Sequence, residues 1–176
     1  MKFEGYFSVD THGKIYKGSI FKSEDKVIVF DMDGVLTLQK GNYENGKRNG
    51  ADKYQQHSQA KKVLQMALQD FNKVVLWSLS PKVLDLEGFP YNEVDQRIVG
   101  AQFLDVEGNL DTVNQERGDY IKNLAIINKN LENVVAIEDG DNLFFPRERV
   151  ISIRPHENLE VIYGKAKKLV WKKGQR

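Results

Sequence analysis

The sequence predicts a single α/β domain with a central, mostly parallel sheet and helices on both of its faces. Short apolar runs rich in β-branched residues recur along the chain, and each is typical of a strand buried on both faces. Segments with apolar residues at helical spacing lie between these runs. The 176 residues contain no internal repeat or visible domain boundary, so we expect residues 1–176 to form one domain.

The first third of the chain predicts a hairpin, a strand, a loop and a helix. Residues 3–21 alternate apolar and polar side chains around a turn at 11–13, which is typical of a β-hairpin covering a sheet edge. A buried strand is expected at 26–30. Residues 39–50 are rich in Gly and Asn and have no apolar face, which predicts a mobile loop. One helical stripe then consists of Ala60, Val63, Leu64, Ala67, Leu68 and Phe71.

The remaining elements follow the same logic. Buried strands are expected at 73–77, 134–137 and 150–153. Helices are expected at 81–86, 124–127 and 158–171, the last with one apolar face. Residues 97–113 are typical of a hairpin that turns at 107–109.

Composition excludes several classes of function. The absence of cysteine excludes disulfides, thiolate metal sites and a cysteine nucleophile. A formal net charge of +1 gives no support to nucleic-acid binding, and the basic residues of 165–176 suit a solvated helix end better than a binding patch. No apolar stretch approaches the roughly 20 residues of a membrane span, and the N-terminus lacks the pattern of a classical signal peptide. We therefore expect a soluble protein, cytoplasmic by default, with delivery into another cell left open.

Carboxylates follow two of the predicted strands directly. Asp31 and Asp33 come after the first strand, and Glu138 and Asp139 come after the third. The carboxyl ends of parallel strands meet at one edge of the sheet, where ligands bind. Clustered carboxylates repel one another unless a cation neutralises them, and Mg²⁺ prefers such oxygen ligands. The sequence therefore predicts a magnesium site at Asp31, Asp33 and Asp139, with Glu138 as a weaker ligand or outer partner.

The same residues suit phosphoryl transfer. Asp31 can attack a metal-bound phosphoryl group, and Asp33 can donate and then retrieve a proton. Ser78, after the second strand, and Lys122, at an expected helix start, can hold the phosphate. Each residue alone has an ordinary structural explanation, such as a turn, a cap or a solvated lysine; the combination and its order favour catalysis.

These motifs resemble the haloacid dehalogenase superfamily, whose first motif, DxDG after a strand, matches FDMDGVLT at 30–37. Within it the chain is similar to the small phosphatases of the RNA polymerase II C-terminal domain. The stretch LWSLSPKVLDL matches their second motif at Ser78, and GDYIKNLAIINKNLENVVAIEDGDN matches their lysine and acidic motifs at Lys122, Glu138 and Asp139. Over Lys26 to about His156, the resemblance implies a Rossmann-like core, Mg²⁺ and an aspartyl-phosphate intermediate.

Two positions depart from that group. Val35 stands where a threonine is typical, and Asn123 stands where an aspartate is common. Both weaken the assignment to the subgroup, and with it the substrate, while the catalytic positions are kept.

The span from Thr37 to Ser78 is too short for a large cap domain, so an open site is expected. An open site favours a phosphoprotein carrying phosphoserine, phosphothreonine or phosphotyrosine. A candidate substrate rim consists of Tyr43, Lys47, Arg48, Tyr54 and His57, although a plain solvated loop fits equally well. Two alternatives remain: a phosphatase or phosphotransferase for small metabolites or nucleotides, and a non-catalytic module that binds phosphorylated partners.

Overall fold

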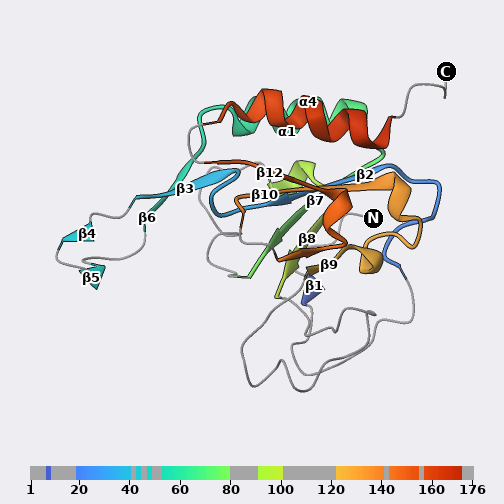
Figure 1. Ribbon diagram of the computed structural model, residues 1–176, viewed down its shortest axis with the longest axis horizontal. Coiled ribbons are helices and arrows are strands. Elements are labelled where there is room, and N and C mark those ends of the chain that lie inside the picture. Colours follow the sequence, from blue (N-terminus) through green and yellow to red (C-terminus); the bar gives the residue numbers. More distant parts are fainter. Residues whose placement is uncertain are drawn as a thin grey trace.

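A computed structural model describes residues 7–8, 19–40, 43–44, 47–48, 53–79, 91–100, 122–140, 143–154 and 157–171. Its centre is a six-stranded sheet with strand order β1-β8-β7-β2-β10-β12, and every neighbouring pair in it is parallel (Figure 1). The strands are β1 (Phe7–Ser8), β2 (Val27–Asp31), β7 (Lys73–Ser78), β8 (Gln96–Val99), β10 (Val134–Glu138) and β12 (Val150–Ser152). The predicted α/β class is confirmed, and the arrangement is that of a Rossmann-like core.

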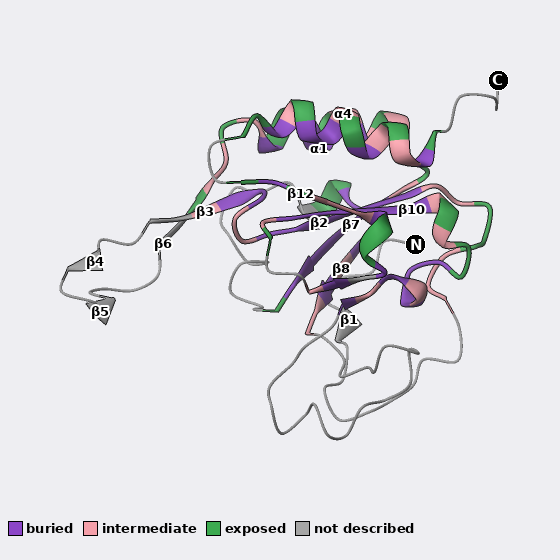
Figure 2. Ribbon diagram, in the orientation of Figure 1, coloured by how far each residue is buried: buried purple, intermediate pink, exposed green. Residues whose placement is uncertain are grey.

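Strand β2 lies at the centre of this sheet, between β7 and β10. Val29 is opposite Val75 on one side and Ala136 on the other. All five residues of β2 are buried, as are all five of β10 (Figure 2). Layers on both faces explain why these strands appear in the sequence as continuous apolar runs, without the alternation of a half-exposed strand.

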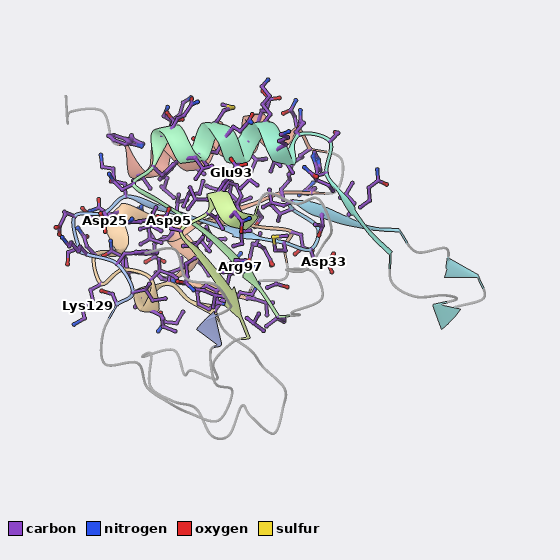
Figure 3. The ribbon with its side chains drawn as sticks, turned by 180° about the vertical axis from the view of Figure 1, so that it is seen from behind. Asp25, Asp33, Glu93, Asp95, Arg97 and Lys129 are labelled. Carbon is purple, nitrogen blue, oxygen red and sulfur yellow. The ribbon has the colours of Figure 1, made fainter. Side chains whose placement is uncertain are left out.

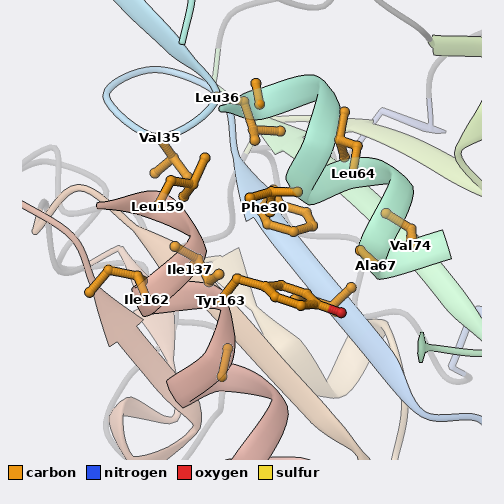
Figure 4. Packing of buried hydrophobic residues seen from close by; sticks show 14 of the residues in the cluster. Phe30, Val35, Leu36, Leu64, Ala67, Val74, Ile137, Leu159, Ile162 and Tyr163 are labelled. Atoms are coloured by element: carbon orange, nitrogen blue, oxygen red, sulfur yellow. The ribbon is translucent and has the colours of Figure 1, made fainter. Parts of the chain in front are cut away.

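Two α-helices cover one face of the sheet. These are α1 (Ala60–Asp70) and α4 (Leu159–Val170), and they lie side by side above it (Figure 1). Their apolar stripes pack on the side chains that β2, β7 and β10 direct to this face. Figure 4 shows this cluster, including Phe30, Leu64, Val74, Ile137, Leu159, Ile162 and Tyr163. Both helices were predicted from their apolar periodicity, and both are confirmed.

The opposite face has a different cover within the described residues. The short parallel pair β9 (Lys122–Asn123) and β11 (Phe144–Phe145) lies there with the 3-10 helix η2 (Leu124–Ile126). The second apolar cluster consists of Val27, Val29, Val75, Trp77, Ile98, Leu124, Ile126, Ile127, Val134, Ala136 and Phe144. Helical segments thus occur on both faces of the sheet. Within the described residues, both α-helices lie on one face, and the opposite face carries the 3-10 helix η2. The remaining 3-10 helices are η1 (Tyr91–Glu93), η3 (Leu131–Asn133) and η4 (Arg147–Arg149).

The prediction of a mobile loop at 39–50 is wrong where the structure describes this segment. Strand β3 (Thr37–Lys40) pairs antiparallel with β6 (Lys53–Gln56), and β4 (Tyr43–Glu44) pairs with β5 (Lys47–Arg48). The two pairs form an arm that extends away from the sheet (Figure 1). Backbone hydrogen bonds hold such a ladder, and an arm away from the core needs no alternating apolar face, so hydrophobic periodicity could not reveal it.

Two residues of the predicted N-terminal hairpin, Phe7 and Ser8, form a strand at one edge of the sheet. Phe7 of β1 lies opposite Ile98 of β8, and β1 is the terminal strand. Strand β8 belongs to the predicted hairpin at 97–113, and it runs parallel to both of its neighbours. The predicted turns at 11–13 and 107–109 and the predicted helix at 81–86 lie outside the described residues. Among the described helices, none combines the length and the apolar character that a bilayer crossing requires.

Candidate active site

The order of the strands reverses at β2. From β2 the chain passes through α1 to β7 and then β8 on one side, and it later returns to β10 and β12 on the other side. In open parallel sheets, ligands bind beyond the carboxyl ends of the strands at such a switch point. Asp31 is the last residue of β2, Glu138 is the last residue of β10, and Asp139 follows it. The carboxylates selected from the sequence therefore converge at the switch point.

The chain turns back tightly after β2. The carbonyl of Met32 accepts hydrogen bonds from the backbone N–H groups of Leu36 at 3.0 Å and Thr37 at 2.8 Å, and from the Thr37 hydroxyl at 2.9 Å. The N–H of Gly34 donates to the carbonyl of Thr37 at 2.8 Å. Asp33 lies inside this turn, half-buried, toward the end of the sheet where β3 begins (Figure 3). The turn thus keeps Asp33 beside the end of β2, as its expected role requires.

Gly34 brings this turn against the side chain of Asp139. Its φ of 77° lies in the left-handed region that favours glycine. A methyl group at Gly34 would lie only 2.5 Å from Cβ of Asp139 and 2.8 Å from its Cγ. Oδ1 of Asp139 is shielded from solvent. A glycine at position 34 is therefore what allows Asp139 to approach the turn that contains Asp33.

Lys122 forms a buried ion pair with Asp31. Its Nζ lies 2.9 Å from Oδ1 of Asp31, and the two side chains are 1% and 6% exposed. The ammonium also lies 3.4 Å from the carbonyl of Trp77 and 4.7 Å from the centroid of the Phe144 ring. Oδ1 of Asp31 accepts a second hydrogen bond from the N–H of Met32 at 2.8 Å. This pair joins two residues that are distant in sequence and that are predicted to belong to one site.

The backbone around Lys122 is set by β9 and by the helix after it. The N–H of Lys122 donates to the carbonyl of Leu143 at 2.7 Å, and Lys122 is paired with Phe144 in the β9–β11 ladder. Asn123 is the N-cap of η2, and its side chain accepts a hydrogen bond from the N–H of Ala125 at 3.0 Å. Lys122 therefore belongs to a short strand just before the helix, close to the helix start predicted for it.

Ser78 reaches the same edge of the sheet from β7. Trp77 is the residue opposite Asp31, and Ser78 follows it as the last residue of the strand, with 3% of its surface exposed. Side chains alternate between the faces of a strand. Ser78 is on the same face of its strand as Leu76, which packs under the helices. Asp31 is on the same face as Val29, which belongs to the cluster on the opposite side of the sheet. The structure thus places Ser78 beside Asp31 along the edge, but on the helix-covered side.

Glu138 is tied to residues that the sequence analysis missed. Its side chain is fully buried, forms an ion pair with Nη1 of Arg147, and accepts a hydrogen bond from the N–H of Phe144 at 3.3 Å. The carboxylate against the turn after β2 is therefore that of Asp139, while the carboxylate of Glu138 is held by an arginine. Arg147 and Phe144 follow the acidic motif closely in sequence. An arginine so near a buried glutamate at a strand end is the sequence feature that could have predicted this ion pair.

The residues of the proposed rim fall into two groups. Tyr43, Lys47, Arg48 and Tyr54 belong to the arm formed by β3 to β6. His57 lies at the base of α1, where its N–H donates to the carbonyl of Leu36 at 2.8 Å and its Nδ1 accepts from the N–H of Gln59 at 3.1 Å. Burial lowers the pKa of His57. These contacts give His57 a structural role at the beginning of the helix.

The donor set suits a hard divalent cation. The carboxylates of Asp31 and Asp139 and the backbone carbonyl of Asp33 are of the ligand types that Mg²⁺ prefers, and these residues could hold such an ion. Lys122 pairs with Asp31 at this end of the sheet, where Asp139 also approaches the turn that contains Asp33, and a cation would neutralise carboxylates clustered there. Within the described residues, no group of three or more His, Cys, Asp or Glu side chains is placed where it could hold a metal ion. The close approach of Gly34 and Asp139 brings one of these carboxylates to the turn that contains Asp33.

Comparison with known proteins adds no family assignment: no protein-family model matches the chain, and no curated protein does. The function is therefore argued from the geometry of the site.

Proposed function

We propose that this protein is a phosphomonoester hydrolase of the haloacid dehalogenase type, with Asp31 as its nucleophile and phosphoproteins as its substrates. The observation that carries this proposal is the buried pair of Asp31 and Lys122 at the switch point, 2.9 Å apart. Buried ion pairs contribute little to stability compared with apolar residues of similar size, so such a pair at the carboxyl ends of parallel strands, where ligands bind, favours a functional role.

The expected chemistry has two steps, in which Asp31 is the nucleophile and Asp33 is first the acid and then the base. An oxygen of Asp31 forms a bond to phosphorus while the bond from phosphorus to the ester oxygen breaks, which gives an aspartyl phosphate. Asp33 donates a proton to the departing oxygen. Its carboxylate then accepts a proton from a water molecule whose oxygen attacks phosphorus, releasing inorganic phosphate and restoring Asp31.

Lys122 and Ser78 complete the phosphate site in this proposal. Lys122 can exchange part of its contact with Asp31 for the phosphoryl oxygens, where its charge is largely unscreened because the side chain is 1% exposed. Ser78 offers a hydroxyl at the neighbouring strand end.

Magnesium is the proposed cofactor. The carboxylates of Asp31 and Asp139 and the carbonyl of Asp33 would hold it. When bound, it would neutralise these carboxylates and the charge of the phosphoryl oxygens.

The small insertion after β2 supports a macromolecular substrate. Between Thr37 and Gln56 the described residues form only paired strands, and α1 follows at Ala60. The arm extends away from the sheet (Figure 1). A phosphorylated side chain displayed on a protein could reach such a site without a large cap having to open.

A phosphopeptide panel assayed with Mg²⁺, beside sugar phosphates and nucleotides, tests this proposal. We expect release of phosphate from phosphopeptides and loss of at least 99% of that activity in Asp31→Asn, since removing a nucleophile costs several orders of magnitude in rate. The matched control is Asp95→Asn. Asp95 also pairs with a lysine, Lys73, at 3.1 Å, but it lies near the opposite end of the sheet from Asp33 (Figure 3).

Three results would contradict the proposal in different ways. Preference for sugar phosphates or nucleotides would replace the phosphoprotein by a small-molecule substrate. Binding of phosphopeptides with Mg²⁺ but no release of phosphate would indicate a binding module. Equal activity in Asp31→Asn and Asp95→Asn would remove Asp31 from its role.

A further inference from the structure

A continuous set of contacts runs from the surface to the ammonium of Lys122. Arg147, whose side chain is 42% exposed, pairs with the fully buried carboxylate of Glu138. Glu138 also accepts the N–H of Phe144 at 3.3 Å, and Nη1 of Arg147 lies 3.5 Å from the carbonyl of Phe144. Both backbone polar groups of Phe144 are thus in contact with this ion pair.

Phe144 transmits that restraint to Lys122 in two ways. It lies opposite Lys122 in the β9–β11 ladder, so the two backbones are held in register. Its ring lies beneath the ammonium, with 4.7 Å between Nζ and the ring centroid, which is within the range of a cation–π contact. The ring also packs edge-on against Trp77, at 5.6 Å and 87°, and the carbonyl of Trp77 contacts the same ammonium.

The charge of Glu138 makes Arg147 more than a packing residue. Glu138 and Asp31 end neighbouring parallel strands. Both are on the sheet face opposite the helices, the face of Ala136 and Val29. Without the guanidinium, the charge of Glu138 would stay buried near the carboxylate that Lys122 neutralises, and the two anions would compete for one ammonium. With Arg147 in place, Lys122 remains with Asp31.

We propose that Arg147 and Glu138 are positioning residues, which act through Phe144 to hold the ammonium of Lys122 against Asp31. The expected effect on kcat/KM rests on the proposed phosphatase function. The expected effect on the position of the Lys122 ammonium does not. Neither Arg147 nor Glu138 is proposed to contact the substrate.

The test compares Arg147→Ala with Arg147→Lys in the full-length chain and uses two readouts. The first is the rate at which a small amine-acetylating reagent labels Lys122, measured by mass spectrometry of its peptide. The second is kcat/KM for a phosphopeptide, together with the inhibition constant of inorganic phosphate. Lys167→Ala is the matched control, because Lys167 is also 42% exposed and also pairs with a carboxylate, that of Asp70.

We expect Arg147→Ala to label Lys122 several-fold faster than the wild type. We also expect it to weaken inhibition by phosphate and to lower kcat/KM by about 10–100-fold, the usual effect of removing an outer partner of a site residue. Arg147→Lys should restore most of each value, and Lys167→Ala should change none of them. Labelling of the exposed Lys62 serves as an internal reference for the reagent. Urea unfolding of each variant separates this pattern from a general loss of stability, which would also expose Lys122.

The outcomes separate the two proposals. A folded Arg147→Ala protein with unchanged labelling and unchanged kcat/KM overturns the positioning role, while an active wild type leaves the phosphatase in place. Faster labelling of Lys122 in a protein whose wild type hydrolyses no phosphoester supports the positioning role and rejects the proposed function. If circular dichroism shows that Arg147→Ala does not fold, Phe144→Leu removes the ring with the ion pair kept, and unchanged labelling there overturns the proposal.

Discussion

Replacing Lys122 with methionine tests the buried ion pair directly. The change keeps a side chain of similar length and removes the ammonium that lies 2.9 Å from Oδ1 of Asp31. The carboxylate would stay 6% exposed, with the N–H of Met32 as a remaining donor. Removing one partner of a buried pair costs about 3–5 kcal/mol, because the other charge is left in the interior. At a slope of about 2 kcal/mol per molar urea, the unfolding midpoint should fall by about 1.5–2.5 M.

The assay is urea unfolding of four proteins: the wild type, Lys122→Met, Asp31→Asn and the double variant. The double variant removes both charges, so it should recover much of the loss, with a coupling energy of about 1.5–3 kcal/mol. Lys73→Met is the control, because its pair with Asp95 is 33% and 28% exposed and should be worth less than about 1 kcal/mol. If Lys122→Met costs no more than this control, or if the two single losses simply add, the reasoning about the pair is refuted.

Three further predictions concern the turn, the metal and the helix pair. Gly34→Ala places a side chain at a φ of 77° and against Asp139, so we expect a loss of about 1–3 kcal/mol in thermal unfolding and weaker Mg²⁺ binding by calorimetry; wild-type affinity would contradict the role of this contact. Excess chelator should abolish phosphate release and added Mg²⁺ should restore it, whereas activity that persists in chelator would exclude the metal. Burial raises the pKa of Asp70, but hydrogen bonds from Lys167 and Tyr163 outweigh it and hold the pKa below its ordinary value of 3.8. The resulting stability is present above that value and is lost as the pH falls through the lowered pKa, so Asp70→Asn should flatten the decline of the urea midpoint below about pH 4, and an unchanged decline would count against this linkage.

The central elements could be predicted because burial leaves a mark on composition. Strand β2 is covered on both faces and appears as an unbroken apolar run, and α4 shows its buried stripe at helical spacing. The arm from Thr37 to Gln56 could not be predicted in this way. Its strands pair by ladder hydrogen bonds and extend away from the sheet, so its Gly-rich and Asn-rich sequence resembles a loop.

In the candidate site, too, some features could be predicted from the sequence and others could not. Residue type and position after strands were enough to select Asp31, Asp33, Ser78 and Asp139, since polar side chains at strand ends are visible in the sequence. Lys122 was selected as a cation at an expected helix start. Their mutual contacts were not visible. The distinction between Asp139, which meets the turn, and Glu138, which pairs with an arginine, also needed coordinates.

The sequence by itself determined the α/β class, the buried strands and the set of polar residues at their ends, because local periodicity and composition record which faces are buried. The tertiary structure alone decided that Lys122 meets Asp31, that Gly34 admits Asp139 and that Arg147 takes Glu138. The physical reason is that electrostatic and steric interactions depend on distance in space. That distance is set by the order of the strands in the sheet and by their register, neither of which leaves a periodic pattern in the chain.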